Sequence, residues 1–139
     1  MKIATISLLL PLLAGISLPA LADGPANDPL TGTNWHLASL GDAPAADGVK
    51  STMTIAEDGM VSGNGGCNGF GGTVTVTGDA VAFSQMRSTM MACEEKAMQQ
   101  EHALHMALEA AKTYAIDGQT LTLRDGSGTP VATFSSAMN

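Results

Sequence analysis

The stretch SGNGGCNGFGG, residues 62–72, has a glycine at roughly every second position around a single cysteine, Cys67. An ordered glycine costs roughly 0.5–1 kcal/mol relative to alanine inside a strand or helix, so this density of glycine requires an explanation. A phosphate-binding loop, a flexible linker, a metal site and a disulfide-anchored turn are four candidates. Each predicts different residues around the glycines.

The neighbouring residues do not fit a phosphate-binding loop or a flexible linker. A P-loop needs a lysine directly after its last glycine, but no lysine lies between Lys50 and Lys96. Counted from Gly63, a dinucleotide-binding fingerprint would have its third glycine at position 68, where the chain has Asn68. Strand-like residues flank both ends, unlike in a linker. Bulges, tight corners and close backbone approach remain as the roles that need glycine here.

The first 22 residues have the layout of a secretory signal peptide. Lys2 precedes an apolar stretch, which ends in the small-residue triplet Ala20-Leu21-Ala22. This layout predicts cleavage after Ala22 and a periplasmic or secreted protein, with an uncleaved anchor helix as the alternative. No cysteine lies near the cleavage site to carry a lipid. Residues 23–32 are rich in proline, glycine, Asn and Asp, and we expect a flexible leader there.

Two cysteines, Cys67 and Cys93, lie 26 residues apart in the part that we expect to be exported. An even cysteine count in an oxidising compartment is first interpreted as a disulfide, worth roughly 3–4 kcal/mol at this loop length. A bare backbone around Cys67 would let the second cysteine approach. The alternative is a pair of redox-active thiols, which a C-x-x-C spacing would have favoured.

Composition restricts the class of partner. The formal net charge is −7, which disfavours nucleic acid and anionic lipid surfaces, since both need cationic neutralisation. Aromatic residues make up only 4% of the chain while there are nine methionines, so we expect Met, Leu and Val to fill much of the core. The length after residue 32 suits one domain, which we place at 33–136.

Short alternating segments predict strands on both sides of one helix. Expected strands lie at 35–39, 52–55, 73–77, 80–86, 114–116, 121–124 and 131–135. In the last of these, either Val131 and Thr133 or Ala132 and Phe134 face the core, depending on the register. Trp35 is expected to point inward as a core anchor, with a sugar-stacking role as the alternative.

The segment from Glu94 to Lys112 lacks glycine and proline and is rich in strong helix formers. Its spacing predicts a helix with Lys112 in the last turn. The predicted inward stripe consists of Ala97, Met98, Glu101, Leu104, Ala107, Leu108 and Ala111. The fold class is therefore α+β: a small antiparallel β-sheet or partly open barrel packed with one α-helix.

The segment VSGNGGCNGFGGTVTVTGDAVAFSQMRSTMMAC, residues 61–93, resembles the signature of the META/HslJ domain family. The likeness begins at the W-x-L segment of residues 35–37 and extends through EHALHMALEAAKTYAIDGQTLTL at 101–123. It covers residues from about 33 to 134. The positions that match the family's motif are Trp35, Gly63, Gly66, Asn68, Gly72, Thr89, Glu101, Tyr114 and Gly118.

The resemblance implies a small β-rich domain with one helix, found in exported bacterial proteins. It also implies that Cys67 and Cys93 form a disulfide. Family members include heat-inducible outer-membrane lipoproteins linked to envelope stress and antibiotic tolerance, with no established enzymatic activity. This chain departs from the family in lacking a lipid-anchor cysteine, and in having Val74 where an aromatic residue is common.

Some side chains could in principle support catalysis or bind a metal. Ser88, Cys93, His102, His105 and Glu109 contain the atoms of a nucleophile and a base, but no catalytic motif contains them, so we predict neither an enzyme nor a cofactor. His102 and His105 could share a helix face, and Met86, Met90, Met91 and Cys93 provide soft sulfur atoms. We favour core and surface roles for all of these. The alternative metal site uses His102, His105, Met90 and Met91.

Three residues near the glycine stretch have roles that the sequence leaves open. Asn68 could hydrogen-bond within its own turn. Arg87, one of few cations in an acidic chain, could pair with Asp79 or Glu94, or could bind an anionic group of a partner. With Phe70, it forms the possible binding surface.

Together these observations predict an exported, non-enzymatic META-like module that binds a protein or an envelope component. The resemblance adds an expected role in envelope stress or drug tolerance. The alternative function is a periplasmic copper- or zinc-binding protein that uses methionine and histidine side chains.

Overall fold

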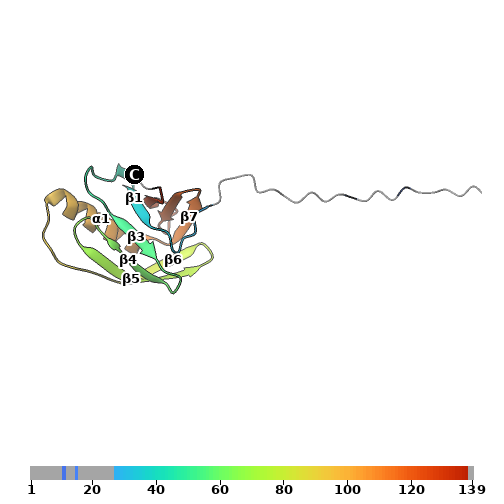
Figure 1. Ribbon diagram of the computed structural model, residues 1–139, viewed down its shortest axis with the longest axis horizontal. Coiled ribbons are helices and arrows are strands. Elements are labelled where there is room, and N and C mark those ends of the chain that lie inside the picture. Colours follow the sequence, from blue (N-terminus) through green and yellow to red (C-terminus); the bar gives the residue numbers. More distant parts are fainter. Residues whose placement is uncertain (1–10, 12–14, 16–26, 138–139) are drawn as a thin grey trace, which may run out of the picture.

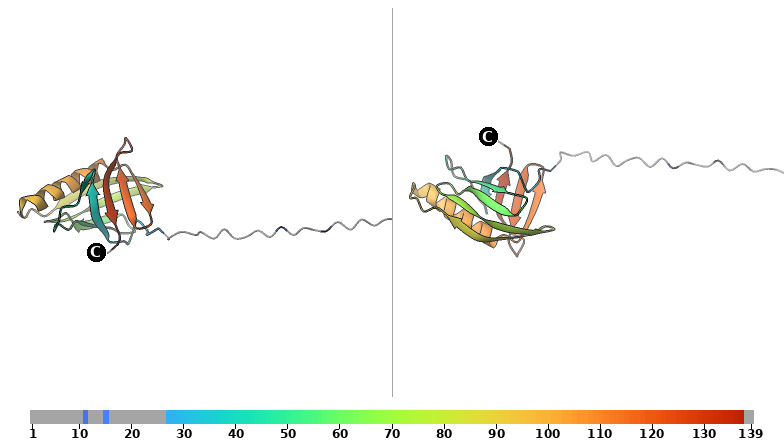
Figure 2. Two further views of the ribbon diagram at one scale, coloured as in Figure 1. Left: turned by 90° about the horizontal axis from the view of Figure 1, so that it is seen from above. Right: turned by 60° about the horizontal axis from the view of Figure 1, so that its bottom comes forward.

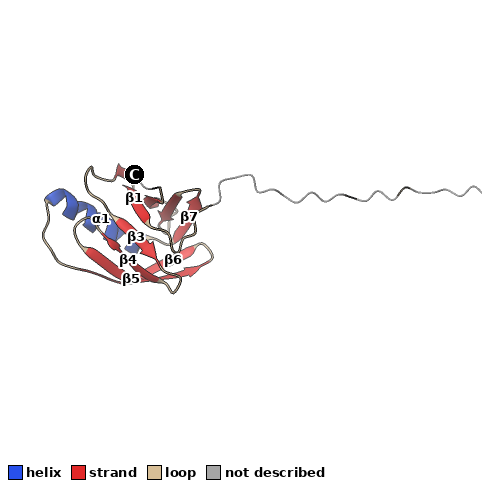
Figure 3. Ribbon diagram, viewed as in Figure 1, coloured by secondary structure: helices blue, strands red, loops and turns tan. Residues whose placement is uncertain are grey.

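The computed structural model describes residues 27–137 and the isolated positions Pro11 and Gly15. The predicted signal peptide, apart from those two positions, and residues 23–26 of the predicted leader lie outside the described residues. Figures 1 and 3 show that strands come both before and after one helix along the described chain. The elements are β1 (Trp35–Leu40), β2 (Ala43–Pro44), β3 (Thr52–Ile55), β4 (Met60–Asn64), β5 (Gly69–Thr77), β6 (Ala80–Ser88), α1 (Glu95–Ala110), β7 (Thr113–Asp117), β8 (Thr120–Arg124) and β9 (Pro130–Ser135).

The strands form one antiparallel sheet that returns on itself. The order is β2-β1-β3-β4-β5-β6-β7-β8-β9, and β1 also pairs with β9, which joins the two ends of the sheet into a ring. The weakest junction is between β6 and β7, which are paired only at Ala80 and Thr113. Figure 2 shows α1 lying against this curved sheet, and it contacts β1, β6 and β9. The predicted α+β class is confirmed.

One hydrophobic core lies between the sheet and the helix. Its largest fully buried side chains come from β1, β3, β4, β8, β9 and α1, and they include Trp35, Met53, Leu104, Leu121 and Phe134. Alternation along each strand places every second side chain inward, as it does for Met53 and Ile55 in β3. In β9 the inward residues are Ala132 and Phe134, which settles the register that the sequence left open.

The predicted flexible leader is wrong for residues 27–32. Leu30 is 8% exposed and belongs to the core, and the indole Nε1 of Trp35 donates to its carbonyl oxygen at 3.1 Å. The Gly32 amide donates to the Ile55 carbonyl at 2.8 Å. The Asn27 side chain bonds the Ile116 carbonyl and the Gly118 amide, each at 2.8 Å. Proline, glycine and Asx content indicates a loop but does not show whether that loop packs.

The helix also differs from its prediction at three positions. Glu94 is the residue before the first turn, and α1 ends at Ala110 because Ala111 is extended. Lys112 is therefore outside the helix, and its amide instead donates to the Arg124 carbonyl at 2.7 Å. Met98 is 37% exposed, and Gln100 is buried in its place.

Gln100 is buried because its amide is satisfied by hydrogen bonds. Its Oε1 accepts from the Ala46 amide at 2.7 Å, and its Nε2 donates to the Ser51 hydroxyl at 2.8 Å. A buried polar group with partners costs little, so a glutamine can replace an apolar residue on the inner face of a helix. Among the described residues, no helix is both long and apolar enough to cross a membrane.

Candidate functional site

The glycine stretch forms a hairpin whose strands are β4 and β5. Its turn, residues 65–68, is closed by a bond from the Gly65 amide to the Asn68 carbonyl at 2.9 Å, and by one from the Gly66 amide to the Asn64 side chain at 2.8 Å. Gly66 has φ +127°, which only glycine adopts readily. A Cβ on Gly65 would lie 2.6 Å from the Glu101 carboxyl, so the turn can approach α1 only without side chains.

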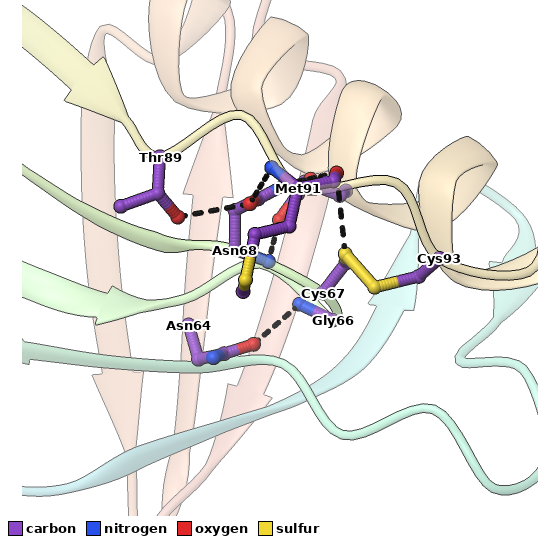
Figure 4. Close-up of a disulfide and its surroundings, with 8 residues drawn as sticks. Asn64, Gly66, Cys67, Asn68, Thr89, Met91 and Cys93 are labelled. Atoms are coloured by element: carbon purple, nitrogen blue, oxygen red, sulfur yellow. Dashed lines mark hydrogen bonds between the residues drawn. A yellow bond between two sulfur atoms is a disulfide. The ribbon is translucent and has the colours of Figure 1, made fainter.

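A disulfide joins this turn to the segment that leads into α1. Cys67 and Cys93 are bonded, with their Cα atoms 5.9 Å apart, which confirms the predicted pairing (Figure 4). Cys93 is therefore not available as a thiolate, either to act as a nucleophile or to bind a metal ion. Cys93 is exposed and Cys67 is half-buried, so the bond lies at the surface of the turn.

The Asn68 side chain also joins this turn to the segment that leads into α1; we call this meeting point the junction. The prediction that Asn68 bonds within its own turn is therefore wrong for its side chain. Asn68 is 2% exposed. Its Oδ1 accepts from the Thr89 hydroxyl at 2.8 Å and from the Met91 amide at 2.7 Å (Figure 4). Its Nδ2 donates to Glu101 Oε2 at 2.8 Å and to the Met91 carbonyl at 3.2 Å.

Glu101 completes this network from α1. Glu101 is 5% exposed, and its Oε1 accepts from the backbone amide of Asn68 at 2.6 Å. The helix therefore holds the turn through both oxygens of one carboxyl. We interpret Asn68, Thr89 and Glu101 as structural, because every polar atom that they direct inward is bonded to the protein itself.

Beside this junction lies a groove of about 430 Å³, hereafter the glycine groove. Its lining brings together the predicted pair Phe70 and Arg87: Phe70 is 6% exposed and Arg87 is exposed. In the strand register, Gly71 lies opposite Arg87 and Phe70 lies opposite Ser88. The lining residues are Ser62, Gly63, Gly69, Phe70, Gly71, Arg87, Ser88 and Thr89.

The glycines of this region divide into two groups. A Cβ on Gly63 would collide with the Thr52 carbonyl and lie 2.8 Å from the Phe70 ring, and one on Gly72 would lie 3.0 Å from the Ser84 carbonyl. Packing therefore requires glycine at both positions. A Cβ on Gly69 or Gly71 would meet only ordinary contacts, at 3.8 and 3.4 Å.

Neither Gly69 nor Gly71 has the positive φ that requires glycine. What their missing side chains provide is the open space of the glycine groove. Sequence reasoning missed this role for Gly69, Gly71 and Ser62. The available signal was the alternation of β5, which places Gly69 and Gly71 on the face opposite to Phe70.

Arg87 does not have Asp79 as its partner. The two residues lie at opposite ends of β6, and eight extended residues span roughly 25 Å. Arg87 instead lines the glycine groove and a smaller adjoining hollow of about 120 Å³. That hollow is also lined by Met86, Ser88, His105 and Glu109.

The structure separates the two helix histidines. The His105 ring packs edge-on against Phe70, with the ring centroids 5.3 Å apart, whereas His102 is exposed. His105 Nε2 is buried and has no hydrogen-bond partner among the described residues. Met90 and Met91 are 92% and 58% exposed. Residues 27–137 hold no group of three or more His, Cys, Asp or Glu side chains placed to bind a metal ion.

Comparisons with solved structures find proteins of similar overall fold. The chain is similar in structure to a protein from Burkholderia xenovorans solved by NMR, with a TM-score of 0.64 and 25% identity over 88% of this chain and all of that one. It also has the fold of a DUF4847 family protein from Bacteroides vulgatus, with a TM-score of 0.58 and 17% identity over 79% of this chain and 96% of that one.

A search of curated proteins finds no match to the chain. A family model for the META domain matches residues 28–138, which begins two residues before the buried Leu30 and includes every described strand and α1. The chain therefore belongs to the META domain family.

Proposed function

We propose that this chain is an exported, non-catalytic META-domain module that binds a protein or an envelope component through the glycine groove. The observation that supports it is the pair Gly69 and Gly71, which neither packing nor backbone conformation requires. Replacing glycine within a strand by a residue with a side chain normally favours the strand. Retaining glycine at both positions is explained if the space beside them is needed.

The lining of the groove indicates the chemistry of the partner. The lining is mostly apolar, and the hydroxyls of Ser62 and Ser88 can exchange hydrogen bonds with a polar chain. Arg87 adds a planar cation that suits a carboxylate or a phosphate group. In a chain of net charge −7, a local cation selects for an anionic group at this position. We infer a partner with an apolar group and an acidic group close together.

Export and lack of catalysis are part of the same proposal. The apolar segment before Ala22 and the surface disulfide both suit an oxidising compartment. His105 and Ser88 line one hollow, yet His105 Nε2 has no partner in the described part of the chain, whereas a nucleophile's base is hydrogen-bonded. The proposed role in envelope stress or drug tolerance rests on the family likeness alone.

Site-specific cross-linking tests the proposal. A photoreactive residue at Ser62 should give a discrete cross-linked product in the native envelope, and a second substitution, Gly71→Val or Arg87→Glu, should remove that product. The control Lys112→Glu makes the same charge reversal at an exposed residue away from the groove and should leave the product intact. Equal cross-linking in all three variants would show that the groove is not the binding surface.

A second candidate function is copper or zinc binding by methionine and histidine side chains. The exposure of Met90, Met91 and His102 favours it, because these side chains are accessible to an ion in solution. Calorimetry of the purified protein with Cu(I) and with Zn(II) distinguishes the two functions. Sub-micromolar binding that is lost in His102→Ala would support the metal function, and its absence would exclude it.

A further inference from the structure

A second hollow, of about 390 Å³, lies toward the other end of β5 from the glycine groove. We call it the acidic hollow. The residues that form it come from the segment before β1, the end of β3, the β3–β4 turn, β5 and β7. They are Leu30, Thr31, Ile55, Ala56, Glu57, Asp58, Gly59, Val74, Val76 and Tyr114.

The inside of the acidic hollow is apolar. Leu30, Ile55 and Val74 belong to the core and are nearly buried. Val76 is 40% exposed, and Tyr114 is half-buried. An aliphatic surface beside an aromatic ring can take up the apolar body of a small molecule.

The rim is acidic and is held in place by the turn. Glu57 and Asp58 are both exposed there. The turn is closed by bonds from the Ala56 amide to the Met60 carbonyl at 2.8 Å and from the Gly59 amide to the Ala56 carbonyl at 2.9 Å. The Met60 amide donates to Asp58 Oδ1 at 3.0 Å, which fixes that carboxyl. These bonds hold the backbone of the turn and one of the two carboxyls.

We propose that the acidic hollow binds a small organic cation, an amine or quaternary ammonium group attached to a short apolar body. The two carboxyls attract the charge, and the excess of acidic over basic residues, 13 to 6, adds to the attraction from the whole molecule. Tyr114 provides a ring on which such a cation can lie. The apolar body then covers Val76 and reaches toward Leu30.

Amide spectra in a titration with hexyltrimethylammonium test this proposal. We expect shifts confined to residues 30–31, 55–59, 74–76 and 114, with a dissociation constant on the order of 1 mM. Hexanol and hexanoate have the same apolar body without the positive charge and should bind more weakly. Hexanoate binding as tightly as the cation, or shifts that lie elsewhere, would overturn the proposal.

Variants separate the charge from the shape. The double substitution Glu57→Gln/Asp58→Asn should weaken the cation roughly three- to tenfold, because two exposed charges are removed. The matched control Asp47→Asn/Glu94→Gln removes the same two negative charges at exposed residues that do not line the hollow. If both variants weaken binding equally, the attraction comes from net charge alone and the site is refuted. Val76→Thr keeps the β-branched shape and should also weaken binding.

Discussion

At the scale of single residues, Asn68 and Glu101 hold the glycine-rich turn to the helix. One asparagine side chain bonds the turn before β5 to residues 89–91 and to α1, and one carboxyl accepts from two of its N–H groups. Buried polar groups of this kind are costly when one partner is removed, because the remaining groups lose water without gaining a bond. The junction is therefore sensitive to changes of a single atom.

Glu101→Gln should lower the free energy of unfolding by about 1–3 kcal/mol, because the new amide group would face an N–H donor instead of accepting from it. Urea denaturation of the two proteins measures the difference. Glu95→Gln is the control, since Glu95 lies on the exposed face and bonds only Gln99 in the described contacts, and we expect a change below about 0.5 kcal/mol. Equal stability of both variants would refute a structural role for Glu101.

The two groups of glycines give opposite predictions for the same substitution. Gly71→Ala should leave stability unchanged or raise it by roughly 0.5–1 kcal/mol, because alanine restricts the unfolded chain and its Cβ has room. Gly63→Ala should lower stability by about 1–3 kcal/mol, the usual range for overpacking. Thermal denaturation followed by circular dichroism compares them. A loss of stability in Gly71→Ala would show that Gly71 is structural and would remove the support for the groove.

At the scale of elements, α1 is held to the sheet by its inner face and by the segment that precedes it. Its buried residues include Leu104 and Leu108, both fully buried, while Met106 on the outer face is 57% exposed. The segment before it is tied to the β4–β5 turn by the disulfide and by Asn68, which also bonds Glu101 of the helix. The helix thus has two independent attachments, one apolar and one polar and covalent.

Leu104→Ala should cost about 2–5 kcal/mol, because it leaves a cavity between α1 and the sheet. Met106→Ala, on the same helix, should change stability by less than about 0.5 kcal/mol. Chemical denaturation of both variants provides the comparison. Similar losses in the two variants would mean that the helix packs with a different face inward.

Removing the disulfide should lower stability by roughly 3–4 kcal/mol, the chain-entropy value for a 26-residue separation. We expect the Cys67→Ala/Cys93→Ala variant and the reduced wild-type protein to unfold at the same urea concentration, since both lack the covalent bond. The oxidised wild-type protein should unfold at a higher one. An unchanged midpoint after reduction would contradict this.

At the scale of the whole molecule, the ring is closed unevenly. β1 and β9 pair over several residues, whereas β6 and β7 share only the Ala80–Thr113 pair in the described chain. The flanking bonds of that junction run from Val81 to Lys112 and from Tyr114 to Asp79, each at 2.9 Å. A junction with so few bonds is where a ring opens at low free energy.

Native-state hydrogen exchange should therefore show two classes of amide. The Val81 and Tyr114 amides should exchange through local opening, with a lower opening free energy than the amides of β1 that bond β9. The latter should exchange only on global unfolding. If added urea affects both classes equally, the β6–β7 junction does not open locally.

The pairing of the cysteines was predicted from their even number and from the family resemblance. Residue spacing and local propensity, which act over a few neighbouring residues, predicted the helix, seven of the nine strands and the core positions of Trp35 and Leu104, but not β2 and β4. In contrast, the partners of Asn68, the burial of Leu30 and the proximity of Phe70, Arg87 and His105 join segments far apart in the chain.

The amino-acid sequence by itself determined that this protein is an α+β domain of alternating strands and one helix, with a glycine-rich turn at its disulfide. Only the tertiary structure decided which glycines are required by packing, which ones leave a groove open, and where the rim of the acidic hollow lies. The physical reason is that periodicity sets which face of an element is buried, whereas the contacts of that face depend on how distant strands and the helix are brought together when the ring closes.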